Sequence, residues 1–331
     1  MRRLGYVPAL DGLRGIAILL VIAFHYTGQP LGGAYGVDLF FVLSGFLITT
    51  LLLEERAGTG RIRFAGFYGR RARRLFPALA ALLCTYLLYN AILGRNALGT
   101  VADYGLYFGN IYFVVSHKAD NTGLGHLWSL AEEEQFYLLW PCLLLVLARA
   151  RRPVYWLTAL VLALVAYRFA LVLHGAGMNR LYRAPDTHSE GLVLGALLAY
   201  LRQRGFAAGE WAGKLGLALA IPPVVAGDWR IGLPIFELGA VLLIAAAVSE
   251  TEISRGLSVR PLLWLGTLSY SLYLWHFPVL WAFHANHRLL ALAVTFLLAW
   301  LSYRFVERPF RRRRAARVEP AVRPSPASVV P

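Results

Sequence analysis

Long apolar segments are the feature that most constrains how this chain can fold. A helix needs about 20 mostly apolar residues to cross the hydrocarbon core of a bilayer, and ten segments come near that length. Only 15% of the residues are charged, against roughly 25% in a soluble domain. The sequence therefore predicts an all-α, polytopic membrane protein with about ten transmembrane helices. The predicted spans are roughly 9–28, 36–53, 75–93, 126–148, 154–173, 186–203, 211–227, 231–249, 261–283 and 287–306.

Two stretches outside the spans have their own character. Residues 98–116 are aromatic and amphipathic, which is typical of an interfacial or re-entrant segment. Residues 311–331 begin with arginines and continue with Pro, Ala and Val. We therefore expect a membrane domain over 1–310 and a basic, disordered cytoplasmic tail over 311–331, with its arginines near anionic lipid headgroups.

The formal net charge of +15 is explained by membrane orientation better than by nucleic-acid binding. With the N-terminus placed in the cytoplasm, 25 of the 33 Lys and Arg fall on cytoplasmic segments, six on outer loops and two inside spans. Positive residues prefer the cytoplasmic side. We therefore expect both termini in the cytoplasm, membrane lipid as a partner, and no nucleic acid.

The first span contains two polar residues within DGLRGIAILLVIAFHY (11–26). Arg14 and His25 are eleven residues apart, about three helical turns and about 16 Å, so they share one helix face. One interpretation is an arginine that snorkels inward and a histidine at the far interface. The other is function, because ionisable groups inside a membrane usually serve one.

The second span begins with GVDLFFVLSGFLI, and its Asp38 enters the membrane near the level of His25. A carboxylate beside an imidazole fixes its tautomer and raises its basicity, as a general base requires. We therefore predict an Asp38–His25 pair.

The segment FYGRRARRLFPAL leads into the third span with Arg70, Arg71, Arg73 and Arg74, followed by Pro77. Positive-inside topology alone would produce such a cluster. A phosphate clamp would as well, because the guanidinium fork matches phosphate oxygens. Spacing does not decide between them.

Further polar residues enter the membrane from the outer side. HLWSLAEEEQFYLLWP carries His126, Trp128, Ser129 and Glu133, with Ser129 and Glu133 on one helix face. His276 lies in LSYSLYLWHFP. Under one topology these residues form an outer chamber of histidines and carboxylates opposite a basic inner entrance. Cys84 and Cys142 give no metal pattern, and we expect no metal.

At these residues the chain resembles the acyltransferase 3 family of bacterial membrane O-acyltransferases. The resemblance extends over most of the chain, and APDTHSEG, with Asp186, His188 and Glu190, is more polar than is usual in the family. The segments that carry it are DGLRGIAILLVIAFHY, GVDLFFVLSGFLI, FYGRRARRLFPAL, HLWSLAEEEQFYLLWP, LSYSLYLWHFP and SYRFVERPF.

The resemblance implies a ten-span core in the bacterial inner membrane that transfers an acyl group, commonly acetyl, from acyl-CoA to a carbohydrate hydroxyl. It implies a paired motif at Arg14 and His25 and an Arg-x-x-Arg motif at Arg71 and Arg74, with Pro77. It also implies the standalone form, without the extracytoplasmic esterase-like domain of some members.

Together these patterns suggest a mechanism. The catalytic residues would be His25, Asp38 and Arg14, and the arginine cluster at Arg70, Arg71 and Arg74 would hold the phosphates of CoA. The acceptor would be placed by Ser129, Glu133, Trp128, His126 and His276. Direct transfer and a covalent acyl-His25 intermediate both stay open.

Two other functions also fit a polytopic chain with a polar chamber. One is a carrier or flippase for a lipid-linked sugar or small metabolite, and the other is a scaffold that presents loops. Release of free CoA would separate an enzyme from both.

Overall fold

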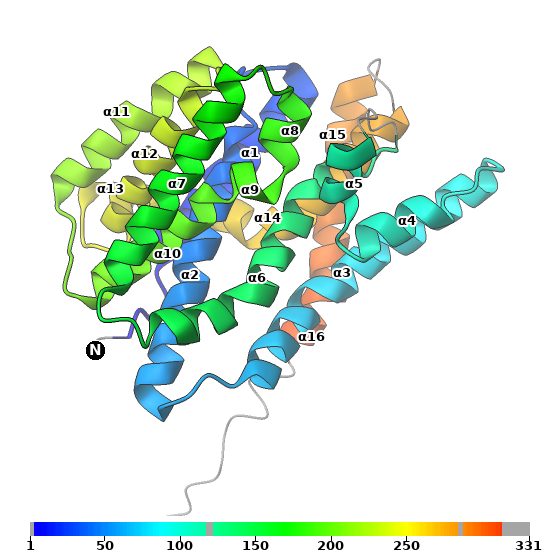
Figure 1. Cartoon of the computed structure of the whole chain (residues 1–331). Coiled ribbons are helices and arrows are strands. Elements are labelled where there is room, and N and C mark those ends of the chain that lie inside the picture. The colour runs from blue at the N-terminus through cyan, green and yellow to red at the C-terminus, as the bar shows by residue number, and fades with distance from the viewer. Residues whose placement is uncertain (1–2, 117–121, 284–286, 313–331) are drawn as a thin grey trace, which may run out of the picture.

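The computed structural model describes residues 3–116, 122–283 and 287–312, and over these residues the regular elements are all helical (Figure 1). Residues 313–331 of the predicted tail lie outside the described residues. In chain order the elements are α1 (Pro8–Thr27), α2 (Tyr35–Thr59), α3 (Phe64–Ile92), α4 (Leu98–Gly105), α5 (Gly109–Ser116), the 3-10 turn η1 (Gly125–Leu127), α6 (Trp128–Leu147), α7 (Pro153–Leu173), α8 (Met178–Arg183), α9 (Pro185–His188), α10 (Glu190–Gln203), α11 (Glu210–Ala226), α12 (Gly232–Ala247), α13 (Glu252–Leu257), α14 (Arg260–Phe283), α15 (Arg288–Leu301), the π-helical segment η3 (Ser302–Glu307) and α16 (Arg308–Arg312).

Five helices among the described residues are long and apolar enough to cross a membrane. They are α1, α2, α3, α7 and the continuous helix Arg288–Phe310. Over the described residues this confirms the all-α class, and the five candidate spans agree with a membrane protein. α6, α10, α11, α12 and α14 occupy the other predicted spans, and the number that cross remains a prediction.

Residues 98–116, predicted to be interfacial or re-entrant, form the two short helices α4 and α5. α4 lies beside the C-terminal half of α3, and the two project together from the bundle (Figure 1). α5 returns the chain to α6 and α8. Its position next to α6 brings the chain back to the centre of the bundle.

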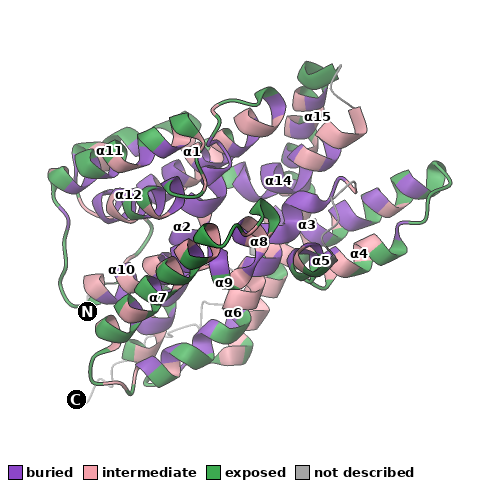
Figure 2. Ribbon diagram, turned by 45° about the horizontal axis from the view of Figure 1, so that its top comes forward, coloured by how far each residue is buried: buried purple, intermediate pink, exposed green. Residues whose placement is uncertain are grey.

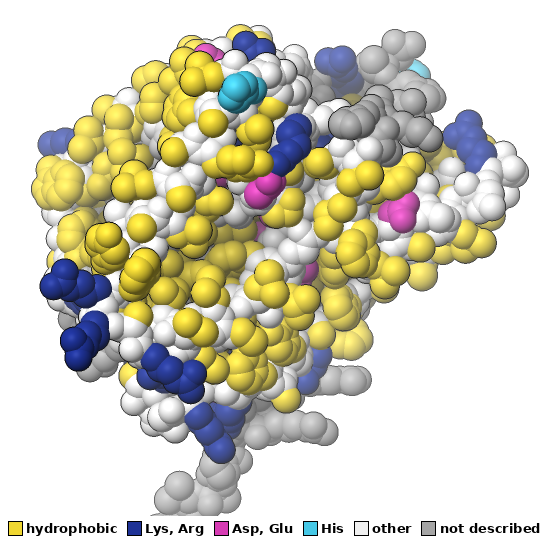
Figure 3. All heavy atoms as spheres, viewed as in Figure 1, with side chains coloured by type: hydrophobic (Ala, Val, Ile, Leu, Met, Phe, Trp, Pro, Cys, Tyr) yellow, Lys and Arg dark blue, Asp and Glu magenta, His cyan; other side chains and the backbone are white. Residues whose placement is uncertain are grey.

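α2 is the helix around which the others pack. In its most apolar stretch 78% of the residues are buried, against 17% in α7. Figure 2 shows the same contrast between the buried centre and the exposed outer faces of α7 and α11. Hydrophobic side chains cover most of the visible surface in Figure 3. Such a surface is unusual for a soluble monomer, and it suits contact with lipid tails.

Small residues let two helix pairs approach closely. A Cβ on Gly266 of α14 would lie 1.9 Å from the backbone oxygen of Asp11 in α1, and a Cβ on Gly45 of α2 would lie 1.9 Å from that of Leu192 in α10. Only glycine tolerates such distances, and small residues serve the same purpose in other membrane bundles. These two contacts fix α1 against α14 and α2 against α10, which are the helices that position the polar sites.

Candidate active site

A cavity of about 280 Å³ lies between α1, α2, α3, α6 and α14. We call it the inner cavity. It unites five of the residues predicted from sequence, which come from three different helices, α1, α3 and α6. Its polar and tyrosine lining residues are Arg14, Ser44, Arg71, Arg74, Ser129, Glu133, Tyr137, Ser269, Tyr270 and Tyr273.

Arg71 is held in the wall of this cavity by two residues of α6. Its Nη2 donates to Glu134 Oε1 at 2.9 Å, and its guanidinium carbon lies 3.2 Å from the centroid of the Tyr137 ring. The carboxylate and the ring face compensate the charge as it leaves bulk water. Arg71 is therefore a pre-oriented cation with donors left for a ligand.

Arg14 and Glu133 add charges of opposite sign to the same cavity. Arg14 Nε and Nη2 each lie 3.3 Å from Ser269 Oγ, and Glu133 accepts a hydrogen bond of 2.7 Å from Ser44 Oγ. The sequence predicted Glu133 at the acceptor. The structure places it on the wall that it shares with Arg71 and Ser129, and its role at the acceptor stays a prediction.

A second cavity of about 540 Å³ opens next to the first, and we call it the basic mouth. Arg71 and Arg74 line both cavities, so the two meet at these residues. The charged residues that line the basic mouth are Arg3, Glu54, Glu55, Arg63, Arg70, Arg71, Arg73 and Arg74. The predicted cluster therefore surrounds a concave site that leads to the inner cavity.

Three histidines from distant parts of the sequence meet in one cluster. The rings of His25 and His276 have centroids 5.1 Å apart, and those of His126 and His276 are also 5.1 Å apart. α1, η1 and α14 supply them. The close packing of α1 on α14 explains the contact between His25 and His276. His126 joins them from η1, so the cluster contains three residues that the sequence predicted for the site.

Each clustered histidine has one ring nitrogen on a backbone carbonyl. His25 Nδ1 lies 2.8 Å from Val21 O, His276 Nδ1 lies 2.6 Å from Tyr273 O, and His126 Nε2 lies 3.2 Å from Leu274 O. A carbonyl only accepts, so the nitrogen that contacts it carries the proton. The other nitrogen of each neutral ring is then the basic one, which for His25 is Nε2.

Tyr273 connects the histidine cluster to the inner cavity. Its hydroxyl donates to the backbone oxygen of His126 at 2.6 Å and lies 2.6 Å from Ser129 Oγ. Because its one proton goes to that carbonyl, Ser129 donates to Tyr273. Both residues line the inner cavity, whereas none of the described lining residues is a histidine. The cavity therefore ends at Ser129 and Tyr273, with the histidines behind them.

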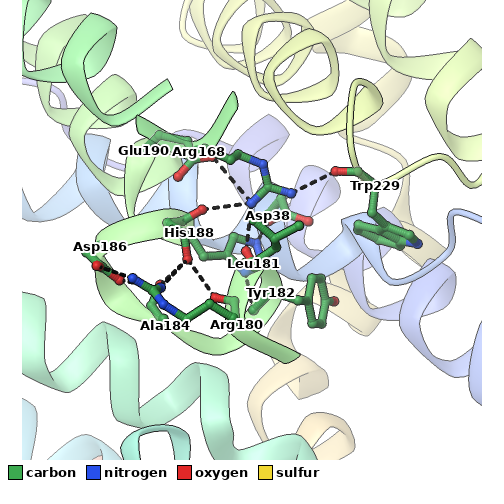
Figure 4. Close-up of polar contacts among 11 residues, drawn as sticks. Asp38, Arg168, Arg180, Leu181, Tyr182, Ala184, Asp186, His188, Glu190 and Trp229 are labelled. Carbon is green, nitrogen blue, oxygen red and sulfur yellow. Dashed lines mark hydrogen bonds and ion pairs between the residues drawn. The ribbon is translucent and has the colours of Figure 1, made fainter. Parts of the chain in front are cut away.

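The predicted Asp38–His25 pair is wrong. Asp38 Oδ1 lies 2.5 Å from His188 Nε2, and both side chains are fully buried (Figure 4). Asp38 shares a face of α2 with Val42 and Gly45, and Val42 and Gly45 pack against α10. The prediction rested on the equal depth of Asp38 and His25 in the membrane. A pair also requires that the Asp38 side chain face α1, and it faces α10 and His188 instead.

Arg168 holds the segment around His188 in place (Figure 4). Its guanidinium donates at 2.7 Å to each of the backbone oxygens of Leu181, Thr187 and Trp229. Glu190 Oε1 lies 3.9 Å from Arg168 Nη1. The polar APDTHSEG segment is thus part of a buried network between α2, α7 and α10, and its main visible role is structural.

The other predicted residues lie around these sites. Arg70 faces Glu55 at 3.2 Å in the basic mouth. Trp128 is buried against the rings of His188 and Tyr182. Pro77 lies inside α3. Tyr273 and Glu134 were not among the residues predicted from sequence, although Tyr273 lies three residues before His276 and so one helical turn away.

A protein-family profile described as "Acyltransferase domain" matches residues 7–309. O-acetyltransferase OatA of Staphylococcus aureus (strain NCTC 8325 / PS 47) is 32% identical over 93% of this chain and 58% of its own length. Peptidoglycan O-acetyltransferase OatA of Listeria monocytogenes is 32% identical over 93% and 56%. The putative peptidoglycan O-acetyltransferase YrhL of Bacillus subtilis (strain 168) is 34% identical over 92% and 55%.

The chain thus spans little more than half the length of these relatives. No solved structure matches it. The match to the family covers the inner cavity, the histidine cluster and nearly all of the basic mouth. Among the residues that line these sites, only Arg3 and Phe310 of the basic mouth lie outside 7–309.

Proposed function

Because this chain belongs to the acyltransferase 3 family, we propose that it is a bacterial membrane O-acetyltransferase. It takes the acetyl group from acetyl-CoA on the cytoplasmic side and transfers it to a carbohydrate hydroxyl on the outer side. The names of its relatives make peptidoglycan the first acceptor to test. The observation that carries the proposal is the route from the basic mouth through the inner cavity to Ser129 and Tyr273, next to the clustered histidines.

The donor enters through the basic mouth. Arg71 and Arg74 line the boundary between the two cavities, so they bind the pyrophosphate while the thin pantetheine arm passes into the inner cavity. Arg14 and Glu133 line that cavity and offer a donor and an acceptor to the amides of the arm. The thioester then arrives at Ser129 and Tyr273. Once Tyr273 turns aside, the Ser129 hydroxyl that donated to it can stabilise the developing oxyanion.

His25 acts as the general base. Its Nδ1 proton is held by Val21 O, so Nε2 accepts the proton of the acceptor hydroxyl. The hydroxyl oxygen bonds to the thioester carbonyl carbon, the carbon–sulfur bond breaks, and the thiolate takes the proton from His25 and leaves as CoA. Tyr273 turns aside to admit the thioester, because it separates the inner cavity from the histidines.

His126 and His276 bind the acceptor. Each has a basic ring nitrogen that is buried without a hydrogen-bond partner among the described residues, His126 Nδ1 and His276 Nε2. Such nitrogens accept hydrogen bonds from sugar hydroxyls, and buried polar atoms usually have a partner. Neighbouring hydroxyls of the acceptor fill this role.

The test is acetyl transfer by the purified protein, measured as CoA released from acetyl-CoA in the presence of peptidoglycan fragments or other glycans. His25→Ala should reduce turnover by about 10²- to 10⁴-fold, the usual contribution of a general base, and leave acetyl-CoA binding intact. His174→Ala is the matched control, because His174 is exposed at the end of α7.

A His25→Ala variant with near-normal turnover would overturn the assignment of the base. Movement of a glycan across vesicles without CoA release would instead favour a carrier. In that case substitution of Arg71 and Arg74 by Ala should leave transport largely unchanged, whereas the proposed enzyme should lose donor affinity.

A further inference from the structure

The basic mouth carries more positive charge than a pyrophosphate requires. Six arginines and two glutamates among the described residues line it, a net formal charge of +4. Arg71 and Arg74, at the boundary with the inner cavity, account for two of these arginines. The rest of the mouth keeps four arginines and two glutamates, a net formal charge of +2, which a second anionic group would match.

Arg63 and Arg70 are held together on the mouth by one carboxylate. Glu55 Oε1 lies 3.2 Å from Arg63 Nε, and Glu55 Oε2 lies 3.2 Å from Arg70 Nη2. The Glu55 side chain is only 12% exposed, whereas those of Arg63 and Arg70 are 61% and 30% exposed. Glu55 thus anchors two guanidinium groups whose other donors remain available to a ligand in the mouth.

The order of the arginines follows the order of groups in the donor. Arg74 lines both cavities, while Arg70 and Arg63 line the mouth alone. Arg70 is one helical turn of α3 before Arg74, and Arg63 directly precedes α3. In acetyl-CoA the thioester and pantetheine come first, the pyrophosphate next, and the ribose with its 3′-phosphate last.

We propose that Arg63 and Arg70, anchored by Glu55, form a subsite for the 3′-phosphate of the donor nucleotide. This inference rests on acetyl-CoA as the donor in the proposed function. The 3′-phosphate is a monoester with a charge of about −1.5 to −2 near neutral pH, and the guanidinium fork matches its oxygens. The two diester charges of the pyrophosphate and this monoester together approach the net charge of the mouth.

The test compares acetyl-CoA with 3′-dephospho-acetyl-CoA as donors for the same acceptor. The wild-type protein should have a KM about tenfold or more higher for the dephospho donor, with similar kcat. Arg63→Ala and Arg70→Ala should raise the KM for acetyl-CoA toward the dephospho value and leave the KM for the dephospho donor nearly unchanged. Arg61→Ala is the matched control, since Arg61 is exposed on the same loop and does not line the mouth.

Each result separates this inference from the proposed function. Equal KM values of the wild-type protein for the two donors would overturn the subsite while CoA release still supported the enzyme. An equal rise in KM for both donors in Arg63→Ala and Arg70→Ala would also overturn it, because the lost contact would then lie elsewhere on the donor. Absence of CoA release from either donor would overturn the proposed function and the subsite together.

Discussion

The three clustered histidines are oriented by backbone carbonyls of helices rather than by carboxylates. Val21 O, Tyr273 O and Leu274 O each accept from one ring nitrogen. A carbonyl fixes the tautomer without adding a full negative charge to the membrane interior, where charges are costly. The side-chain pattern alone pointed to Asp38 as the orienting group, because backbone acceptors leave no mark in a sequence.

Substitution of Asp38 tests its structural role. Asp38→Asn leaves buried His188 without its charged partner, so we expect a loss of about 3–5 kcal/mol of stability, the usual result of breaking a buried pair. Thermal unfolding in detergent should show it. Asp186→Asn is the control, because its pair with Arg180 is half exposed and surface pairs contribute about 0–1 kcal/mol. A drop in turnover at an unchanged melting temperature would instead restore a catalytic role for Asp38.

At the scale of the elements, the apolar segments predicted the positions of the helices more accurately than their ends. α2 continues to Thr59 and α3 begins at Phe64, beyond the apolar stretches predicted at 36–53 and 75–93. Hydropathy marks the part of a helix that suits lipid, while the backbone hydrogen bonds continue into the polar region. Arg70, Arg71, Arg73 and Arg74 of the basic mouth are therefore helical, which fixes their order along α3.

The glycine contact between α1 and α14 sets the distance between His25 and His276. Gly266→Ala places a Cβ against the backbone oxygen of Asp11, so the helices must separate, at a cost of about 1–3 kcal/mol. We expect a lower melting temperature and lower turnover, since His276 is carried on the same helix. Gly256→Ala should change neither, because a Cβ there meets open space. An unchanged melting temperature and turnover in Gly266→Ala would mean that the two helices are not closely packed.

At the scale of the whole molecule, the distribution of positive charge predicts which end of the helix bundle faces the cytoplasm. The α2–α3 and α6–α7 loops lie at the lower end in Figure 1, and the α7–α8 connection lies at the upper end. Several Lys and Arg side chains gather at that lower end in Figure 3, below the hydrophobic face. From the positive-inside rule we predict that the lower end lies in the cytoplasm. The basic mouth, which Arg63 and Arg70 line, would then face the compartment that holds acetyl-CoA.

Cysteine labelling tests this orientation. With Cys84 and Cys142 replaced by Ser, Gly177→Cys on the α7–α8 connection should react with a membrane-impermeant maleimide in intact spheroplasts. Arg61→Cys, on the α2–α3 loop, should react only after permeabilisation. Both positions are exposed, so access depends on the side of the membrane. The reverse pattern would put the basic mouth outside, away from cytosolic acetyl-CoA, and the donor route through Arg71 and Arg74 would have to be abandoned even if His25 proved essential.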